Sequence, residues 1–492
     1  MKINTNNNLN IFIMIEYNQF INGQFIKSTS TEVIKVINPC TEEVLATIPK
    51  GSVQDANLAL EAANNAQYKW KSLAAIERAS YLLKMANIIR ENRVSLANTL
   101  AKEQAKVIGL AQVEIDVTAD YFEYNAGWER RIEGEIIQSD RLKEHIYLHK
   151  APIGVAVGIC PWNFPFFVMA RKIAPSIITG NTCIVKPSSE APMTIMEFAK
   201  LVEKLDIPEG VVNFVCGSGS IVGNALSKSP ITGIISLTGS VEAGQRIISA
   251  TAENITKVSL ELGGKAPAIV FADANMDLAV NAVVTSRVIF SGQVCNCAER
   301  VYVEDSAYDE FMDKVSKKMS EVNVQDAFSD DNPDMSSMVS KDQIDKVEEM
   351  VEFAKKEGAE VIVGGKRSDQ FSKGFYYQPT LLASCRQDMQ IIQEEVFGPV
   401  LPVIKFSNID EAIALANDSQ YGLTSSVYSE NFNKVMHVSN ELQFGETYIN
   451  REHFEAIQGF HAGWKKSGIG GADGKHGMEE YLQTKVIYAQ YS

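Results

Sequence analysis

The sequence predicts an α/β fold with two doubly wound domains and a small separate β element. The chain has 492 residues, more than the roughly 100–200 residues of a single domain. Short apolar runs alternate with helix-like segments in its first half, and the same rhythm restarts after Gly263-Gly264. Such alternation is typical of parallel sheets with crossover helices. Two other segments alternate polar and apolar residues without a helix between them, as edge strands do.

The first domain opens with helical periodicity over residues 55–105, where Leu82, Ala86 and Ile89 recur on one face. Buried strands are predicted from four short apolar runs: 155–160, 182–185, 211–215 and 234–237. A helical stretch at 193–205 separates two of them. Because parallel strands need crossover helices, this half predicts a doubly wound sheet.

The second domain repeats the pattern after residue 264. Its predicted elements are strands at 268–271, 361–363, 400–406 and 423–428 and helices at 409–416 and 433–442. The two alternating segments, Glu135–Lys150 and Thr484–Gln490, are expected to pair with each other or with another subunit. The predicted division is 1–134 with 155–264, then 265–478, and finally 135–154 with 479–492 as oligomerisation strands.

Composition excludes several classes of protein. A hydrophobic fraction of 45% and 32 glycines are ordinary for a globular chain, and a net charge of -15 disfavours nonspecific binding of nucleic acid or of an anionic membrane. Seven scattered cysteines suit free thiols in a reducing cytoplasm. The apolar run at 11–15 is too short for a signal peptide. Residues 1–14 are expected to form a loose tail, and Met14 is an alternative start.

Two glycine-rich turns invite a nucleotide-binding interpretation. In Gly217–Gly223 the third glycine comes one residue late for a dinucleotide fingerprint, so a tight strand-to-helix turn is favoured. Gly239–Gly244 follows the strand at 234–237 and opens a helix, where backbone N–H groups suit a pyrophosphate. Neither Gly264-Lys265 nor Gly474-Lys475 has the surroundings of a phosphate-binding P-loop.

No metal site is predicted. His145 and His149 lie four apart in a strand-like segment, which makes them surface residues on one face. Cys295 and Cys297 have no matching cluster elsewhere. A free cysteine such as Cys295 is usually a small core residue, and only the motifs that accompany it in the sequence favour another role.

Six motifs in a fixed order accompany Cys295, and with them the chain resembles the aldehyde dehydrogenase superfamily from about Tyr17 to its end. The motifs are Pro161-Trp162-Asn163-Phe164-Pro165, Lys186-Pro187-Ser188, Thr238-Gly239-Ser240, Leu260-Glu261-Leu262-Gly263-Gly264-Lys265, Gly292-Gln293-Val294-Cys295 and Glu395-Val396-Phe397-Gly398-Pro399. The resemblance implies a Rossmann-like dinucleotide-binding first domain and a catalytic second domain.

The resemblance also implies three catalytic roles. Cys295 is the nucleophile, Glu261 the general base, and the Asn163 amide with the Cys295 backbone N–H the oxyanion hole. A thiolate adds readily to an aldehyde, the resulting alkoxide needs fixed donors, and a carboxylate can activate the water that hydrolyses the thioester.

For the cofactor, the resemblance implies contacts from Lys186, Gly239, Ser240 and Glu395. It also places Pro161, Trp162, Leu262 and Phe397 at the cofactor site. One departure concerns the choice between NAD and NADP. Members that prefer NAD usually carry Glu three residues after the Lys, and this chain has Ser189 there with Glu190 displaced by one. The sequence therefore leaves the choice between NAD and NADP open.

Segments 444–452 and 459–464 resemble the bacterial members that oxidise lactaldehyde and glycolaldehyde. The matching pocket positions are Arg171, Asn296, Glu455 and His461. A pocket that hydrogen-bonds a hydroxyl rejects aldehydes lacking one. The hypothesis is NAD(P)-dependent oxidation of (S)-lactaldehyde to lactate, and of glycolaldehyde to glycolate, by a homodimer or homotetramer.

Alternatives remain at this stage. Arg171 and Glu455 can instead form a structural ion pair, and His461 a surface contact. Within enzymes, the rivals are other aldehydes such as succinic semialdehyde or a betaine aldehyde. Outside enzymes, the rival is a structural protein that kept the fold and lost the chemistry.

Overall fold

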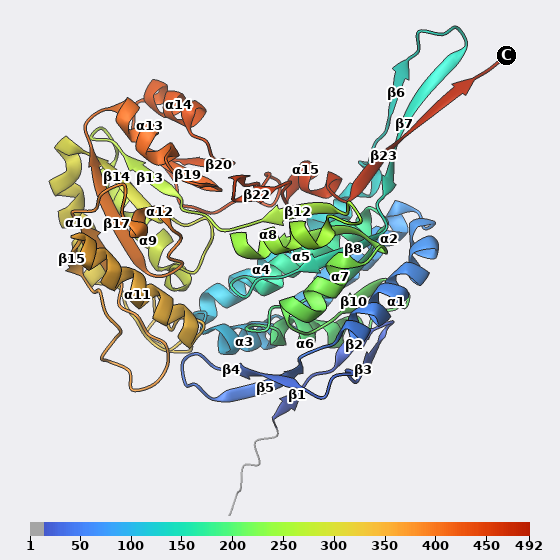
Figure 1. Cartoon of the computed structure of the whole chain (residues 1–492), viewed down its shortest axis with the longest axis horizontal. Helices are drawn as coiled ribbons and strands as arrows, with labels where there is room; N and C mark the ends of the chain where they lie inside the picture. Colours follow the sequence, from blue (N-terminus) through green and yellow to red (C-terminus); the bar gives the residue numbers. More distant parts are fainter. Residues whose placement is uncertain (1–13) are drawn as a thin grey trace, which may run out of the picture.

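The computed structural model describes residues 14–492, which form two sheet domains and a projecting β arm (Figure 1). The predicted tail lies outside the described residues except for Met14, as do residues 11–13 of the apolar run. Within 14–492, no helix is both long enough and apolar enough to cross a membrane.

The first domain is built on an eight-stranded sheet. Its strands, in spatial order, are β22 (Gly468–Ile469), β12 (Lys257–Glu261), β11 (Thr232–Thr238), β8 (Val155–Ile159), β9 (Thr182–Lys186), β10 (Val212–Phe214), β2 (Gln19–Ile21) and β3 (Gln24–Ile26). The five strands from β12 to β10 are parallel. The four predicted strands are confirmed. Strand order reverses between β8 and β11, which creates a topological switch point at their carboxyl ends.

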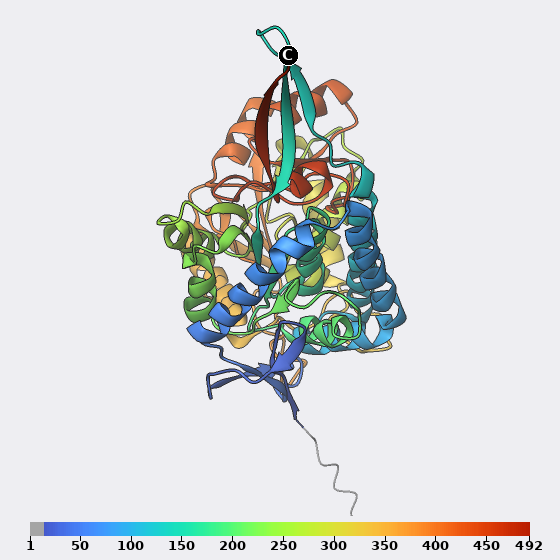
Figure 2. The same cartoon turned by 90° about the vertical axis from the view of Figure 1, so that its right-hand side faces the viewer.

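Helices cover both faces of this sheet (Figures 1 and 2). They are α1 (Val53–Lys71), α2 (Ala75–Glu91), α3 (Arg93–Gln104), α4 (Ile108–Ala126), α5 (Pro165–Ile178), α6 (Met193–Val202), α7 (Asn224–Lys228) and α8 (Val241–Thr251). The helical periodicity at 55–105 thus covers three helices, and the stretch at 193–205 contains α6. Helix α5 is buried along its whole length, as its nearly uniform apolar sequence requires.

The second domain is built on a seven-stranded sheet. Its strands, in spatial order, are β15 (Glu360–Val363), β16 (Thr380–Ala383), β17 (Val400–Phe406), β14 (Arg300–Glu304), β13 (Pro267–Val270), β19 (Thr424–Tyr428) and β20 (Glu446–Ile449). Its helices are α9 (Met276–Val288), α10 (Tyr308–Ser320), α11 (Lys341–Glu357), α12 (Gln390–Gln393), α13 (Ile409–Asn417) and α14 (Phe432–Glu441). The predicted strands and helices are confirmed, whereas β14, β16 and β20 were not predicted.

The arm is a three-stranded sheet of β6 (Glu135–Gln138), β7 (Glu144–Pro152) and β23 (Leu482–Gln490), which projects away from both domains (Figure 1). Strand β23 pairs antiparallel with β7 along its whole length, so the two alternating segments do pair with each other. The first of them is a hairpin rather than one strand, because Lys143 adopts a left-handed φ of 60° in the turn. His145 and His149 are exposed on β7.

Smaller elements complete the fold. A short sheet of β1 (Ile15–Glu16), β4 (Val33–Ile37) and β5 (Val44–Pro49) lies beside the first domain (Figure 1). Strands β18 (Tyr421–Gly422) and β21 (Trp464–Lys465) pair with each other, and α15 (Gly474–Glu479) leads into β23.

Candidate active site

A cavity of about 650 Å³ opens at the switch point of the first sheet and is closed by loops of the second domain. Its first wall includes the residues that follow β8, β9, β11 and β12 and side chains of α4 and α5. Its second wall includes side chains of α9 and α11, the loop before β14, the loop before β17 and the segment 452–461. All predicted site residues line it: Pro161, Trp162, Asn163, Arg171, Lys186, Ser189, Gly239, Ser240, Glu261, Leu262, Cys295, Asn296, Glu395, Phe397, Glu455 and His461.

Cys295 lies on a strained loop that follows α9. Phe290, Ser291 and Gly292 have left-handed φ angles of 47°, 54° and 72°, a conformation that costs energy for residues other than glycine. A Cβ at Gly292 would stand 2.2 Å from the Gly398 carbonyl oxygen, so only glycine fits. The loop thereby presents Cys295, which is partly exposed, whereas the other six cysteines are buried.

Buried polar groups fix the backbone of Asn163. The Lys106 ammonium donates to the Asn163 carbonyl oxygen at 2.6 Å and pairs with Glu114, which accepts from the Phe166 N–H at the start of α5. The Asn163 side-chain amide donates to the Gln293 carbonyl oxygen at 3.0 Å. The amide of Asn163 therefore lies against the loop that carries Cys295.

Glu261 ends β12 and is 3% exposed. Its Oε2 accepts from the Thr238 hydroxyl at 3.1 Å, and Lys172 and Arg171 stand 3.6 and 3.8 Å from the carboxylate. Burial opposes ionisation, but Lys172 and Arg171 lower the pKa of Glu261 below its ordinary value. Its Oε1 has no hydrogen-bond partner among the described residues and lies 3.6 Å from the Lys172 ammonium.

Arg171 organises a buried cluster of carboxylates. Its Nε donates to Asp473 at 3.0 Å and its Nη2 to Glu455 Oε1 at 3.0 Å. The other oxygen of Glu455 accepts from the Asn296 amide at 2.5 Å. Arg171 and Glu455 thus form an ion pair, which was the alternative to a role in substrate binding. This pair lies on the cavity wall.

His461 is 2% exposed, so the alternative of a surface contact is wrong. Its Nδ1 lies 2.6 Å from Glu446 Oε1, and both His461 and Cys295 line the cavity. Burial lowers the pKa of His461, but its polar neighbours, Glu446 among them, outweigh burial and raise that pKa well above the ordinary value.

The cofactor wall fits a dinucleotide by its own chemistry. Lys186 is 4% exposed and its ammonium donates to the Pro187 carbonyl at 3.1 Å, so a buried cation on the cavity can still bind hydroxyl or phosphate oxygens. Gly239 and Ser240 precede α8, and Ser240 caps the helix by accepting from the Ala243 N–H. A helix N-terminus of this kind suits a pyrophosphate.

The ring of Trp162 meets that of Phe397 edge to face, with centroids 5.4 Å apart. Leu262 is buried on the same wall. Ser189 and the exposed Glu190 both line the cavity beside Lys186, so a carboxylate is present at this rim although it is displaced by one position. Gly217–Gly223 is a turn capped by Ser218 and contributes only Gly219 to the lining.

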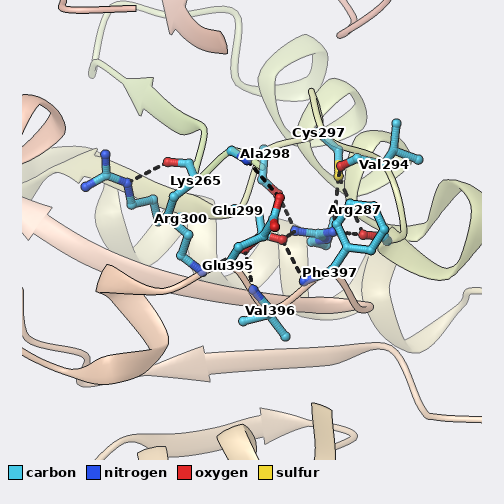
Figure 3. A network of polar contacts seen from close by, with 12 residues as sticks. Lys265, Arg287, Val294, Cys297, Ala298, Glu299, Arg300, Glu395, Val396 and Phe397 are labelled. Carbon is cyan, nitrogen blue, oxygen red and sulfur yellow. Dashed lines mark hydrogen bonds and ion pairs between the residues drawn. The ribbon is translucent and has the colours of Figure 1, made fainter. Parts of the chain in front are cut away.

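A buried network fixes Glu395 and Phe397 (Figure 3). Glu299 accepts from Lys265 and Arg287 and from the backbone N–H groups of Val396 and Phe397, the last two at 3.0 Å. These cations lower the pKa of Glu299 although burial opposes it. Burial and the nearby Glu299 raise the pKa of Glu395, which accepts from the Gly264 N–H at 2.8 Å.

Several residues of the site had no role in the sequence interpretation. They are Lys106, Glu114, Lys172, Thr238, Glu299, Glu446 and Asp473. A local signal existed for Glu446, because the order Glu446-Thr447-Tyr448 places Glu446 and Tyr448 on one face of a strand. Thr238 stands in one of the six motifs, and Lys106 and Glu114 pair with each other eight positions apart. Lys172, Glu299 and Asp473 pair with residues far away in the sequence, which no local pattern predicts.

Comparison with known proteins agrees with this geometry. The profile of the aldehyde dehydrogenase family matches residues 25–487. The lactaldehyde dehydrogenase of Escherichia coli (strain K12) is 51% identical over 97% of this chain and 99% of that protein. A crystal structure of lactaldehyde dehydrogenase from Escherichia coli superposes with a TM-score of 0.96 and covers 97% of this chain and 100% of the other.

A solved 3,6-anhydro-L-galactose dehydrogenase in complex with NAP is 44% identical, with a TM-score of 0.94, and the match covers 96% of this chain and 99% of that one. The motifs, the fold and these matches extend over nearly the whole described chain. The chain therefore belongs to the aldehyde dehydrogenase family.

Proposed function

We propose that this enzyme oxidises small 2-hydroxyaldehydes, (S)-lactaldehyde to lactate and glycolaldehyde to glycolate, with a nicotinamide dinucleotide as electron acceptor. The observation that carries the proposal is the polar pocket of Arg171, Asn296, Glu455 and His461 around Cys295. The similarity to lactaldehyde dehydrogenase supports the same substrate class.

In the proposed mechanism, the Cys295 thiolate adds to the aldehyde carbon. The side-chain amide of Asn163 donates to the new alkoxide. A nicotinamide dinucleotide held by Lys186, Gly239, Ser240 and Glu395 would supply the hydride acceptor for that carbon, and the acyl group would then remain on Cys295 as a thioester. Glu261 then takes a proton from water, the water attacks the thioester, and the acid leaves as the Cys295 thiolate returns.

The pocket supports a hydroxylated substrate for an electrostatic reason. Glu455 and Arg171 are both charged groups in a largely desolvated site, and each retains capacity for a further hydrogen bond. An aldehyde without a hydroxyl would leave that capacity unused beside its methyl group, at a cost of about 1–3 kcal/mol. Succinic semialdehyde would instead place a carboxylate next to Glu455.

The choice between NAD and NADP rests on Ser189 and Glu190. Ser189 adds no charge, which favours tolerance of a 2′-phosphate, whereas Glu190 on the same rim would repel one. We propose that both cofactors are used, with NAD ahead. The seven unpaired thiols support a reducing, cytoplasmic environment.

The exposed apolar side chains of the arm support a homo-oligomer. Ile136, Ile137, Val486, Ile487 and Tyr488 are at least 38% exposed, and such a patch is typical of a subunit interface. Residues 135–154 and 479–492 are accordingly proposed as the strands that join subunits into a dimer or tetramer.

The test is the initial rate of nicotinamide reduction with lactaldehyde, glycolaldehyde, propionaldehyde and succinic semialdehyde, each with NAD and with NADP. Propionaldehyde is the matched control, because it is lactaldehyde without the hydroxyl. We expect kcat/KM for the hydroxyaldehydes to exceed that for propionaldehyde by about tenfold or more, which corresponds to roughly 1.4 kcal/mol. Equal kcat/KM values would mean that the pocket does not bind the substrate hydroxyl, and only the assignment to the family would remain.

A further inference from the structure

The buried ammonium of Lys106 lies between the two loops that carry the proposed oxyanion donors. Its side chain is completely buried, and its Nζ donates to the Asn163 carbonyl oxygen at 2.6 Å. The same Nζ stands 3.7 Å from the ring centroid of Phe164 and 4.5 Å from that of Phe290. Asn163 and Phe164 follow β8 in the first domain, whereas Phe290 belongs to the strained loop before Cys295 in the second. One cation thus contacts both sides of the site.

Glu114 ties this cation to the start of α5. One of its oxygens pairs with Lys106, and the other accepts from the backbone N–H groups of Phe166 and Phe167 at 3.0 and 3.2 Å. Phe164 is the N-cap residue of α5 and has no polar side chain, so Glu114 supplies the cap from a different helix. A carboxylate at this end also complements the helix dipole. The turn that holds Asn163 is therefore fixed on both of its sides.

The backbone of Asn163 is fixed more firmly than its side chain. Its carbonyl oxygen accepts from Lys106 and also from the Gln104 amide at 3.1 Å. Its side-chain nitrogen has one acceptor among residues 14–492, the Gln293 carbonyl oxygen, although an NH₂ group can donate twice. The second N–H is thus left for an alkoxide, and the backbone sets the direction in which it points. Oxyanion donors act by being in place before the charge develops.

We propose that Lys106, held by Glu114, is the positioning residue of the oxyanion hole. It keeps the Asn163 amide at a fixed place relative to the loop that carries Cys295, so that the alkoxide of any aldehyde meets a donor already in position. Lys106 and Glu114 contact no reacting atom and act through Asn163. The inference rests on the proposed function for the role of Asn163 alone, because an aldehyde with or without a 2-hydroxyl forms the same alkoxide.

A double-mutant cycle with Asn163→Ala tests this role. Lys106→Met keeps an unbranched side chain of similar length and removes the charge. The readout is the rate of hydride transfer in the first turnover, followed by stopped-flow absorbance of the reduced cofactor at saturating lactaldehyde or propionaldehyde. We expect Lys106→Met to lower this rate about ten- to hundredfold with either aldehyde, since outright loss of an oxyanion donor costs about 10²–10³-fold. In the Asn163→Ala background, the same substitution should cost about threefold or less.

A matched control separates positioning from stability. Arg78 is also a buried cation, and its Nε donates to the Ile178 carbonyl at 3.1 Å, at the other end of α5. Arg78→Met should therefore lower the melting temperature, as Lys106→Met does, and leave the first-turnover rate within about twofold of the parent. Glu114→Gln keeps the shape of the cap and removes the charge that holds Lys106. It should lower the rate by about three- to tenfold, and only while Asn163 is present.

Two results would overturn the proposal. Equal losses for Lys106→Met in the parent and in Asn163→Ala mean that Lys106 does not act through the amide. A first-turnover rate of Lys106→Met within about twofold of the parent means that Lys106 supports only the fold. If Lys106→Met does not fold, Glu114→Gln in both backgrounds decides by the same criteria. A failed preference for hydroxyaldehydes would leave all these ratios measurable with propionaldehyde, so the two proposals fail separately.

Discussion

Replacement of Glu261 by Gln should stall the enzyme after hydride transfer. Glutamine keeps the shape of Glu261 and its hydrogen bond with Thr238, so the fold and the aldehyde site should be preserved. The variant loses the carboxylate charge, and with it the ionised oxygen that has no hydrogen-bond partner among the described residues and the ion pairs with Arg171 and Lys172. General-base catalysis contributes about 10²–10⁴-fold, or roughly 3–5.5 kcal/mol. Thioester hydrolysis should fall by that factor, whereas hydride transfer should fall less than about tenfold.

Stopped-flow absorbance of the reduced nicotinamide separates the two steps. With excess aldehyde, Glu261→Gln should give a burst of one reduced cofactor per active site, followed by a slow phase. The control Thr238→Val keeps the carboxylate and should show no comparable burst. In the parent, Glu261 can act as a base only while it is ionised. Because its pKa is lowered, the loss of steady-state rate at acid pH should begin only below the ordinary pKa of a glutamate. Loss of both phases by the same factor would refute the role assigned to Glu261.

Three other perturbations test the pocket and its support. Glu455→Gln should lower kcat/KM for lactaldehyde about tenfold and leave propionaldehyde within about twofold, as rates of cofactor reduction show; equal losses would contradict a hydroxyl contact. Glu299→Gln should lower the free energy of unfolding in urea by about 3–5 kcal/mol, because two buried cations lose their partner. The folded-state pKa of Glu299 is lowered, so its stabilisation is complete above the unfolded value of about 4.3 and is lost as pH falls through the folded value; a difference between parent and variant that stays constant at acid pH would argue against it. Gly263→Ala puts a Cβ 2.5 Å from Glu395 Oε2, so the KM for cofactor should rise about tenfold with little change in melting temperature.

The sequence was sufficient for most of the framework. Apolar runs such as 155–160 and 400–406 are nearly continuous because strands buried on both faces need no polar alternation, and both predictions hold. Strand β14 was missed because its apolar run is short and lies between the charged residues Arg300 and Glu304. The structure buries the Arg300 side chain completely and satisfies it with the carbonyls of Lys265 and Ala416. A buried arginine with distant partners looks like a surface residue in the sequence.

The same reason separates the site residues that were predicted from those that were not. Cys295, Glu261 and Asn163 stand in motifs whose neighbours are informative. Glu299 and Lys106 act through residues 97 and 57 positions away in the chain, and only the tertiary fold shows these pairs. Periodicity and spacing report local structure, whereas buried ion pairs depend on which loops the two sheets bring together.

The two walls of the cavity also have a consequence for the diversification of this enzyme. Most of the groups proposed to bind the dinucleotide follow β8, β9, β11 and β12 in one sheet, and Glu395 and Phe397 precede β17 in the other, whereas Glu455 and His461 come from a loop between β20 and β21 that belongs to no regular element. Loops tolerate sequence change that strands do not. Exchange of the segment 450–463 alone should therefore transplant aldehyde preference between relatives, while the redox half of the machinery is inherited intact.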